Sequence, residues 1–294
     1  MQLDRTRIAI RERGFLEIMD LALSVIRGHA WPVFVAWLLM ALPLGAFNYW
    51  LLNGKLLDTE FEFDDPVGWG YVWQLLILMA AEIPLATALI TLYLGQALFE
   101  ERPTAGQVWR QFWNRFGQMF WVQGVLRGGG AMLAILLYVM DVEPALIGLI
   151  EFFLVMFWLL LWVIWPYLNE VLLLERNPLR KAHGGTSTLG RTLSMHSYAA
   201  ADLIARWLVS ATFGSLLVVA LWMSMLTLRQ YIAFEEGIDN AAFTIFLPIA
   251  VWIVMGYFAV VRFLSYLDLR IRSEGWEVEL MMRAEGARLT RQLA

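Results

Sequence analysis

The stretch Tyr266-Leu-Asp-Leu-Arg-Ile-Arg-Ser-Glu-Gly-Trp-Glu-Val-Glu-Leu280 closes the last long apolar run of the chain and opens a charged segment. Its skeleton is Tyr-Leu, six further residues and then Glu. The same skeleton occurs twice earlier, at Tyr93-Leu94 with Glu101 and at Tyr167-Leu168 with Glu175. Each copy lies where a long apolar run meets charged residues. The spacing therefore predicts three similar units, each ending in this motif.

The composition indicates a membrane protein. Apolar residues make up 60% of the 294-residue chain and charged residues 16%, against about 45–50% and about 25% in a soluble domain. So few charges cannot cover that apolar surface, which predicts an all-α integral membrane protein. The net charge of -4 argues against nucleic acid as a partner. The chain contains no Cys, which excludes disulfides and thiolate metal sites.

Long apolar runs predict a six-transmembrane-helix bundle in a single membrane domain, residues 1–294. The spans are expected at about 31–52, 71–99, 119–140, 145–168, 203–228 and 241–264, with residues 265–294 as a charged cytoplasmic tail. The second span can bend at Pro84. The first apolar run is too long for the core of a signal peptide, so we expect it to be an uncleaved anchor.

Amphipathic segments precede three of these spans. Residues 14–27 place apolar side chains on one helical face and charged ones on the other, and residues 100–118 are rich in Trp and Arg. Both patterns predict helices that lie in the membrane interface, although helices packed against the bundle would show the same pattern. A weaker amphipathic segment, with Leu189 and Leu193, precedes the fifth span.

Basic residues predict the orientation of the chain. When alternate polar segments are assigned to two sides, one side receives only Lys55 and Arg229 and the other receives the remaining Arg and Lys. The positive-inside rule then predicts both termini in the cytoplasm and an inner-membrane location. Each third of the chain enters and leaves on the same side, so the three helix-hairpin repeats are expected to be parallel rather than inverted.

Three stretches carry a family resemblance: Gly14-Phe-Leu-Glu-Ile-Met-Asp20, Asn177-Pro178-Leu179 and Tyr266–Gly275. They resemble bacterial proteins of the glycerophosphoryl diester phosphodiesterase membrane-domain family. The resemblance implies a six-helix membrane domain of poorly defined function, sometimes fused to a soluble phosphodiesterase. This chain leaves no room for that catalytic domain, so we do not expect the phosphodiesterase activity.

Ionisable residues inside apolar runs are the first candidates for a functional site, because charge is costly in lipid. Glu82 lies inside the second predicted span, and Arg127 precedes three glycines in the third. A Glu82–Arg127 pair would serve as a polar site for an ion or lipid headgroup, or fix helix packing; Arg127 could instead extend to the inner interface. Glu151, in the fourth span, either faces a cavity or reaches the outer interface.

The closing motif supplies a second candidate, a contact for a protein partner or for anionic lipid at the cytoplasmic face. Its residues are Asp268, Arg270, Arg272, Glu274 and Trp276. On a helix, Asp268 would pair with Arg272 and Arg270 with Glu274. Alternation with apolar residues would also suit a strand, but the helix of the sixth span is expected to run on into this segment. A solvated helix with internally paired charges remains the simpler interpretation.

Motifs of catalysis are missing from the sequence. The chain has three His residues, and none belongs to an HExxH motif. Gly128-Gly-Gly130 has no Lys-Ser/Thr after it, so it is not a phosphate loop. We therefore expect no cofactor and a non-enzymatic membrane scaffold or accessory subunit. The alternative is a transporter or lipid-handling protein that uses Glu82 and Arg127.

Overall fold

The computed structural model describes residues 13–52, 66–97, 103–123, 152–153, 156, 163–165, 167–175, 187–233 and 239–274. Regular structure within these ranges is helical, as predicted. Four described helices are long and apolar enough to cross a membrane, which implies a lipid bilayer around them: Ala30–Leu52, Tyr71–Ala97, Ala199–Ile232 and Ala242–Ser273. They coincide with the first, second, fifth and sixth predicted spans. Most of the third and fourth, 119–140 and 145–168, lies outside the described residues.

The packed centre consists of α2 (Ala30–Leu52), α3 (Pro66–Ala86), α4 (Ala88–Ala97) and α10 (Leu247–Glu274). Their facing side chains form one apolar cluster that includes the fully buried Leu75, Met79, Ile90 and Phe263. Apolar residues surround α2 almost evenly, as expected for a helix whose outer face meets lipid rather than water.

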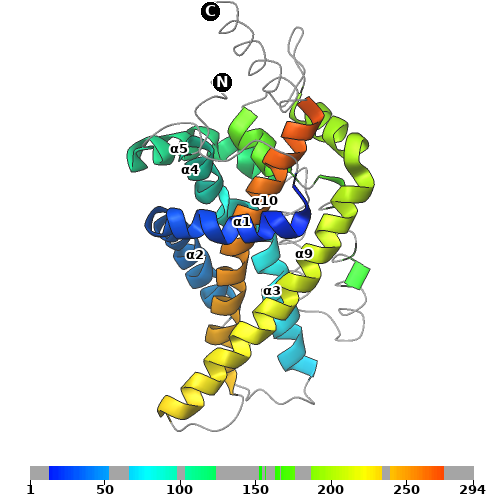
Figure 1. Ribbon diagram of the computed structural model, residues 1–294. Coiled ribbons are helices and arrows are strands. Elements are labelled where there is room, and N and C mark those ends of the chain that lie inside the picture. Colours follow the sequence, from blue (N-terminus) through cyan, green and yellow to red (C-terminus); the bar gives the residue numbers. More distant parts are fainter. Residues whose placement is uncertain are drawn as a thin grey trace, which may run out of the picture.

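Helix α1 (Phe15–Gly28) crosses α10 part-way along its length, and α10 continues beyond the crossing (Figure 1). Its buried face carries Ile18, Met19, Ala22 and Val25. The hydroxyl of Tyr257 donates a hydrogen bond to the carbonyl oxygen of Met19 at 3.1 Å. The predicted amphipathic helix is confirmed, and it packs against the bundle along its apolar face.

Helix α5 (Ala105–Trp121) is the second amphipathic helix and packs against α4. Its start is capped reciprocally, because the backbone N–H of Thr104 donates to Oε1 of Gln107 at 3.1 Å. Val108 and Phe112 are buried, whereas Trp109 and Trp113 remain exposed. The helix runs on to Trp121 without a break at residue 119, where the third span was expected to begin.

Helix α9 (Thr188–Ala233) joins the third amphipathic segment to the fifth span. Ala199 interrupts the helical backbone with φ -139° and ψ 34°, and the chain changes direction there. Beyond this kink α9 runs along the outside of the bundle beside α10 (Figure 1). At its far end Trp222 donates from Nε1 to the carbonyl oxygen of Ala242 at 2.8 Å, in the π-helix η5 (Ala242–Phe246) that leads into α10.

The first residues of the predicted charged tail, 265–274, belong to α10. Among them, Ser265, Tyr266, Asp268 and Leu269 are buried. The reason is that α9 and the π-helix η4 (Val171–Glu175) cover this end of α10. They supply both apolar contacts and charged partners. The expected helix, rather than a strand, is confirmed here, while residues 275–294 lie outside the described residues.

Candidate functional site

The second span is interrupted in the middle of the bundle. Helix α3 ends at Ala86 and α4 begins at Ala88, with Thr87 between them. Pro84 lies three residues earlier and lacks the N–H that would donate to the preceding helical turn. The backbone N–H and the hydroxyl of Thr87 both donate to the carbonyl oxygen of Ile83, at 3.0 and 2.8 Å. Nδ2 of Asn169 donates to the carbonyl oxygen of Pro84 at 3.1 Å.

A buried ion pair faces this interruption. Nε of Arg262, on α10, contacts Oε1 of Glu170, on the short helix α8 (Leu168–Glu170). Nη2 of Arg262 donates to the hydroxyl oxygen of Thr87 at 2.8 Å. The Glu170 side chain is 0% exposed and that of Arg262 15%. We call Thr87, Asn169, Glu170 and Arg262 the interior cluster; it joins three segments distant in sequence.

Two acceptors of the interior cluster stay unused. In the described part of the chain, Oε2 of Glu170 and Oδ1 of Asn169 are buried and receive no hydrogen bond. Buried polar atoms are usually hydrogen-bonded, because leaving one without a partner costs free energy. The cluster therefore combines a compensated charge with two acceptor oxygens directed into the protein.

Glu82 lies one helical turn from the interruption, in α3. Its Oε2 accepts a hydrogen bond from Nδ2 of Asn48, on α2, at 2.8 Å. Asn48 is buried. The expected partner Arg127 and the third candidate, Glu151, lie outside the described residues, so the Glu82–Arg127 pair stays a prediction. The structure instead gives Glu82 a neutral partner on a neighbouring span.

The closing motif is tied into the protein by ion pairs. Oδ2 of Asp268 receives hydrogen bonds from Nη2 of Arg206 and Nη2 of Arg272, both at 2.8 Å. Its Oδ1 accepts from the backbone N–H of Arg13 at 2.9 Å. Asp202, on α9, binds the same two guanidinium groups at 3.0 and 2.9 Å. The Asp268–Arg272 pair is thus as predicted, and the Asp268 side chain is only 5% exposed.

A second group of charges adjoins the first. Tyr266 donates from its hydroxyl to Oε1 of Glu175 at 2.7 Å. Arg191 contacts Oε2 of Glu175 at 3.1 Å, and Arg270 lies 3.9 Å from its Oε1. Glu274 ends α10, and Trp276 lies outside the described residues. We call the two groups together the helix-end network; it joins α1, η4, α9 and α10.

The interior cluster is not among the sites that the sequence predicts. The predicted spans leave Glu170 in a polar connection and place Arg262 among the cytoplasmic charges. The available signal was Asn169-Glu170 directly after a Tyr-Leu closing pair, together with an Arg inside the sixth apolar run. Among the residues that the structure describes, no group of three or more His, Asp or Glu side chains is placed to hold a metal ion.

Comparisons of the chain with protein-family models, with curated proteins and with solved structures find no match.

Proposed function

We propose that this chain is a non-enzymatic, six-span protein of the inner membrane, with both termini cytoplasmic, that acts as a scaffold or accessory subunit of a membrane complex. The helix-end network is the observation that carries the proposal. It fixes α1, η4, α9 and α10 relative to one another at one end of the bundle. The resemblance to the glycerophosphoryl diester phosphodiesterase membrane-domain family belongs to the same proposal, as a resemblance to the membrane part of that family.

The charge balance of the network favours a structural role. Asp202 and Asp268 share Arg206 and Arg272, and Glu175 has Tyr266 and Arg191. Buried charges paired in this way specify one arrangement of helices more than they add stability. A rigid end of the bundle is what a docking platform for another subunit needs.

Helix α5 supplies a surface for such a subunit. It lies at the same end of the bundle as the last turns of α10 (Figure 1). Trp109 and Trp113 pack edge to face with ring centroids 5.7 Å apart, yet are 44% and 52% exposed. Exposed Trp side chains beside Arg110 suit either the lipid interface or a protein partner.

Crosslinking in native membranes followed by affinity purification tests the scaffold proposal. We expect another membrane protein to co-purify with this chain in a fixed molar ratio. The Trp109→Ala/Trp113→Ala variant should lose it, whereas Leu216→Ala, on the exposed face of α9, should retain it. A wild-type chain that purifies alone after crosslinking, or a partner unaffected by the α5 variant, would overturn the proposal.

A second candidate function, transport or lipid handling, is favoured by the interrupted span. Broken helices beside buried charged residues form the binding sites of many transporters. The unused acceptors Glu170 Oε2 and Asn169 Oδ1 would bind the N–H or O–H of a substrate.

The absence of native Cys allows a clean test of this second candidate. The Glu82→Cys variant is treated with a membrane-impermeant thiol reagent. The control is Leu42→Cys, on the outer face of α2. Labelling at residue 82 alone shows a water path and supports transport. No labelling at residue 82 shows a dry interior and supports the scaffold.

A further inference from the structure

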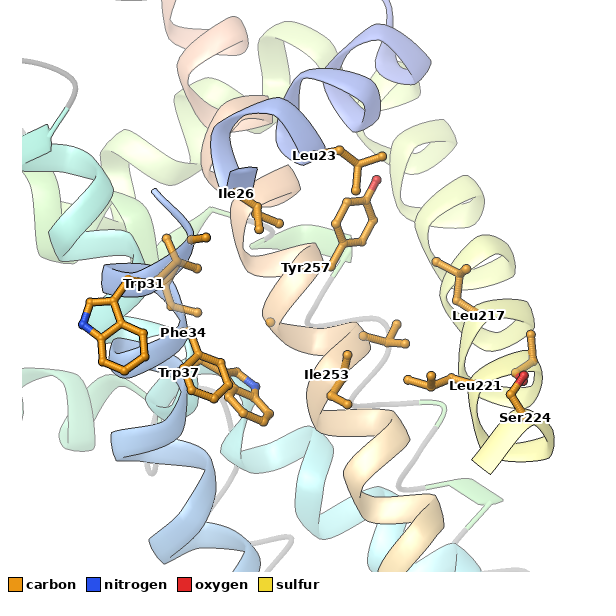
Figure 2. Close-up of a pocket in the computed structure, with 16 residues that line it drawn as sticks. Leu23, Ile26, Trp31, Phe34, Trp37, Leu217, Leu221, Ser224, Ile253 and Tyr257 are labelled. Atoms are coloured by element: carbon orange, nitrogen blue, oxygen red, sulfur yellow. The ribbon is translucent and has the colours of Figure 1, made fainter. Parts of the chain in front are cut away.

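An apolar groove opens between α1, α2, α9 and α10 (Figure 2), and Ile90 of α4 also lines it. Its volume is about 1030 Å³. Trp31, Phe34 and Trp37 of α2 lie on one side and Leu217 and Leu221 of α9 on the other, with Ile253 of α10 between them. Ligand sites in proteins have volumes of roughly 300–1,000 Å³, so the groove holds a ligand of lipid size.

Three of the four polar side chains that line the groove are bound within the protein. The hydroxyl of Tyr257 donates to Met19, and Nε1 of Trp37 donates to the carbonyl oxygen of Trp252 at 2.9 Å. The hydroxyl of Ser224 donates to the carbonyl oxygen of Ala220 at 2.7 Å. A polar small molecule would need several free, placed hydrogen-bonding groups. These walls instead match an alkyl chain.

Gly256 sets the position of the Trp37 ring. A Cβ atom at residue 256 would lie 2.8 Å from Cδ1 and 3.1 Å from Nε1 of Trp37. The indole therefore lies directly against the backbone of α10, as its hydrogen bond to Trp252 requires. This placement leaves the space between α2 and α9 open.

The end of the groove under α1 has charged residues of both signs nearby: Arg27 is on the same helix as Asp20, whose carboxylate interacts electrostatically with Tyr257 in the groove wall. Leu23 and Ile26 border the groove there, and Arg27 follows Ile26 and lies one helical turn after Leu23. Arg27 is exposed, and within the described residues it has no acidic partner, whereas Arg13 on the same helix has Glu17 at 3.8 Å. Trp31, 73% exposed, follows four residues later, in α2. A cation and a Trp at the edge of a membrane helix are suited to a lipid phosphate.

We propose that this groove binds a single phospholipid from the leaflet on the α1 side. One acyl chain lies between α2, α9 and α10, and the phosphate meets Arg27. The guanidinium of Arg27, opposite in charge to a phosphate, and the alkyl-matched walls favour this occupant. The site does not depend on the scaffold role, because it uses neither the helix-end network nor α5.

Photocrosslinking tests the site. The full chain is reconstituted in phosphatidylcholine–phosphatidylglycerol vesicles that contain a trace of phospholipid with a diazirine on its acyl chain. Labelled peptides are then mapped. We expect labelling concentrated on Leu221 and Ile253. Ala220→Trp should abolish it, because the new ring fills the groove from an exposed position.

Val219→Trp is the matched control, since residue 219 is half exposed but does not line the groove. It should keep the wild-type labelling. Arg27→Gln should reduce labelling by the phospholipid severalfold but leave labelling by a diazirine diacylglycerol unchanged. Uniform labelling of Val219 and Leu221 would show annular lipid only and overturn the site, as would equal labelling of the wild type and Ala220→Trp at unchanged melting temperature.

Discussion

Tyr266 and Glu175, which are 91 positions apart, are joined by a hydrogen bond of 2.7 Å from the tyrosine hydroxyl to Oε1 of the carboxylate. Tyr266 opens the third closing motif and Glu175 ends the second. The ring of Tyr167, which opens the second motif, lies with its centroid 6.0 Å from that of Tyr266. Two of the three motifs therefore pack on each other. The first Tyr, Tyr93, shares a hydrogen bond of 2.9 Å with Nδ1 of His29.

Replacing Tyr266 with Phe removes this one bond and keeps the ring. A hydrogen bond to a charged group contributes about 1.5–3 kcal/mol, and Glu175 still has Arg191. We expect the free energy of unfolding in detergent to fall by about that amount, measured by thermal or denaturant unfolding. Tyr231→Phe is the control, since Tyr231 is 77% exposed. Equal stability of both variants would contradict the assigned bond.

The interior cluster predicts strong coupling between Glu170 and Arg262. Removing one partner of a buried ion pair leaves an uncompensated charge and costs about 3–5 kcal/mol. We expect Glu170→Gln and Arg262→Met each to be destabilised on this scale, and the double variant to be clearly more stable than the sum of the two losses implies. A double-mutant cycle of unfolding free energies measures this coupling. Strictly additive losses would show that the two side chains do not interact.

Gly256→Ala tests the close packing of Trp37 on α10. The added methyl would lie 2.8 Å from Cδ1 of Trp37, so the ring must move and its bond to Trp252 is lost. Overpacking of this kind costs about 1–3 kcal/mol, which lowers the melting temperature. Gly117→Ala is the matched control, because no atom lies within 4 Å of the added methyl. It should be neutral or slightly stabilising through helix propensity.

Helix positions were the predictable part of this molecule. Apolar runs located the first, second, fifth and sixth spans, and the two-faced pattern located α1 and α5, because bilayer thickness and helical period are properties of local sequence. Pro84 predicted a bend in the second span, because the effect of proline on a helix is also local in sequence. The side-chain partners could not be read in this way, since Glu170 meets Arg262 across 92 positions.

The end of the sixth span shows where prediction from hydropathy fails for charged residues. Asp268, Arg270 and Arg272 have the composition of a solvated segment, and hydropathy alone ended the span at residue 264. The structure buries Asp268 because Arg206, from a helix 62 positions away, reaches it. A charged residue enters the core only where tertiary structure supplies its counter-charge, and a single sequence does not show which helix supplies it.

The link between α9 and Asp239, which precedes η5, predicts a small acid-sensitive contribution to stability. Arg229 binds Asp239 through two hydrogen bonds of 2.6 and 2.8 Å, and this lowers the pKa of Asp239 from its ordinary value of 3.8. The bond's contribution is therefore complete above about pH 4 and is lost as the pH falls through the lowered value. Since the Asp239 side chain is 50% exposed, we expect the Arg229–Asp239 pair to contribute less than about 1 kcal/mol to the free energy of unfolding. The difference in unfolding free energy between wild type and Asp239→Asn should be constant from about pH 7 to about pH 5 and shrink in stronger acid. A difference that grew on acidification would contradict the assigned pair.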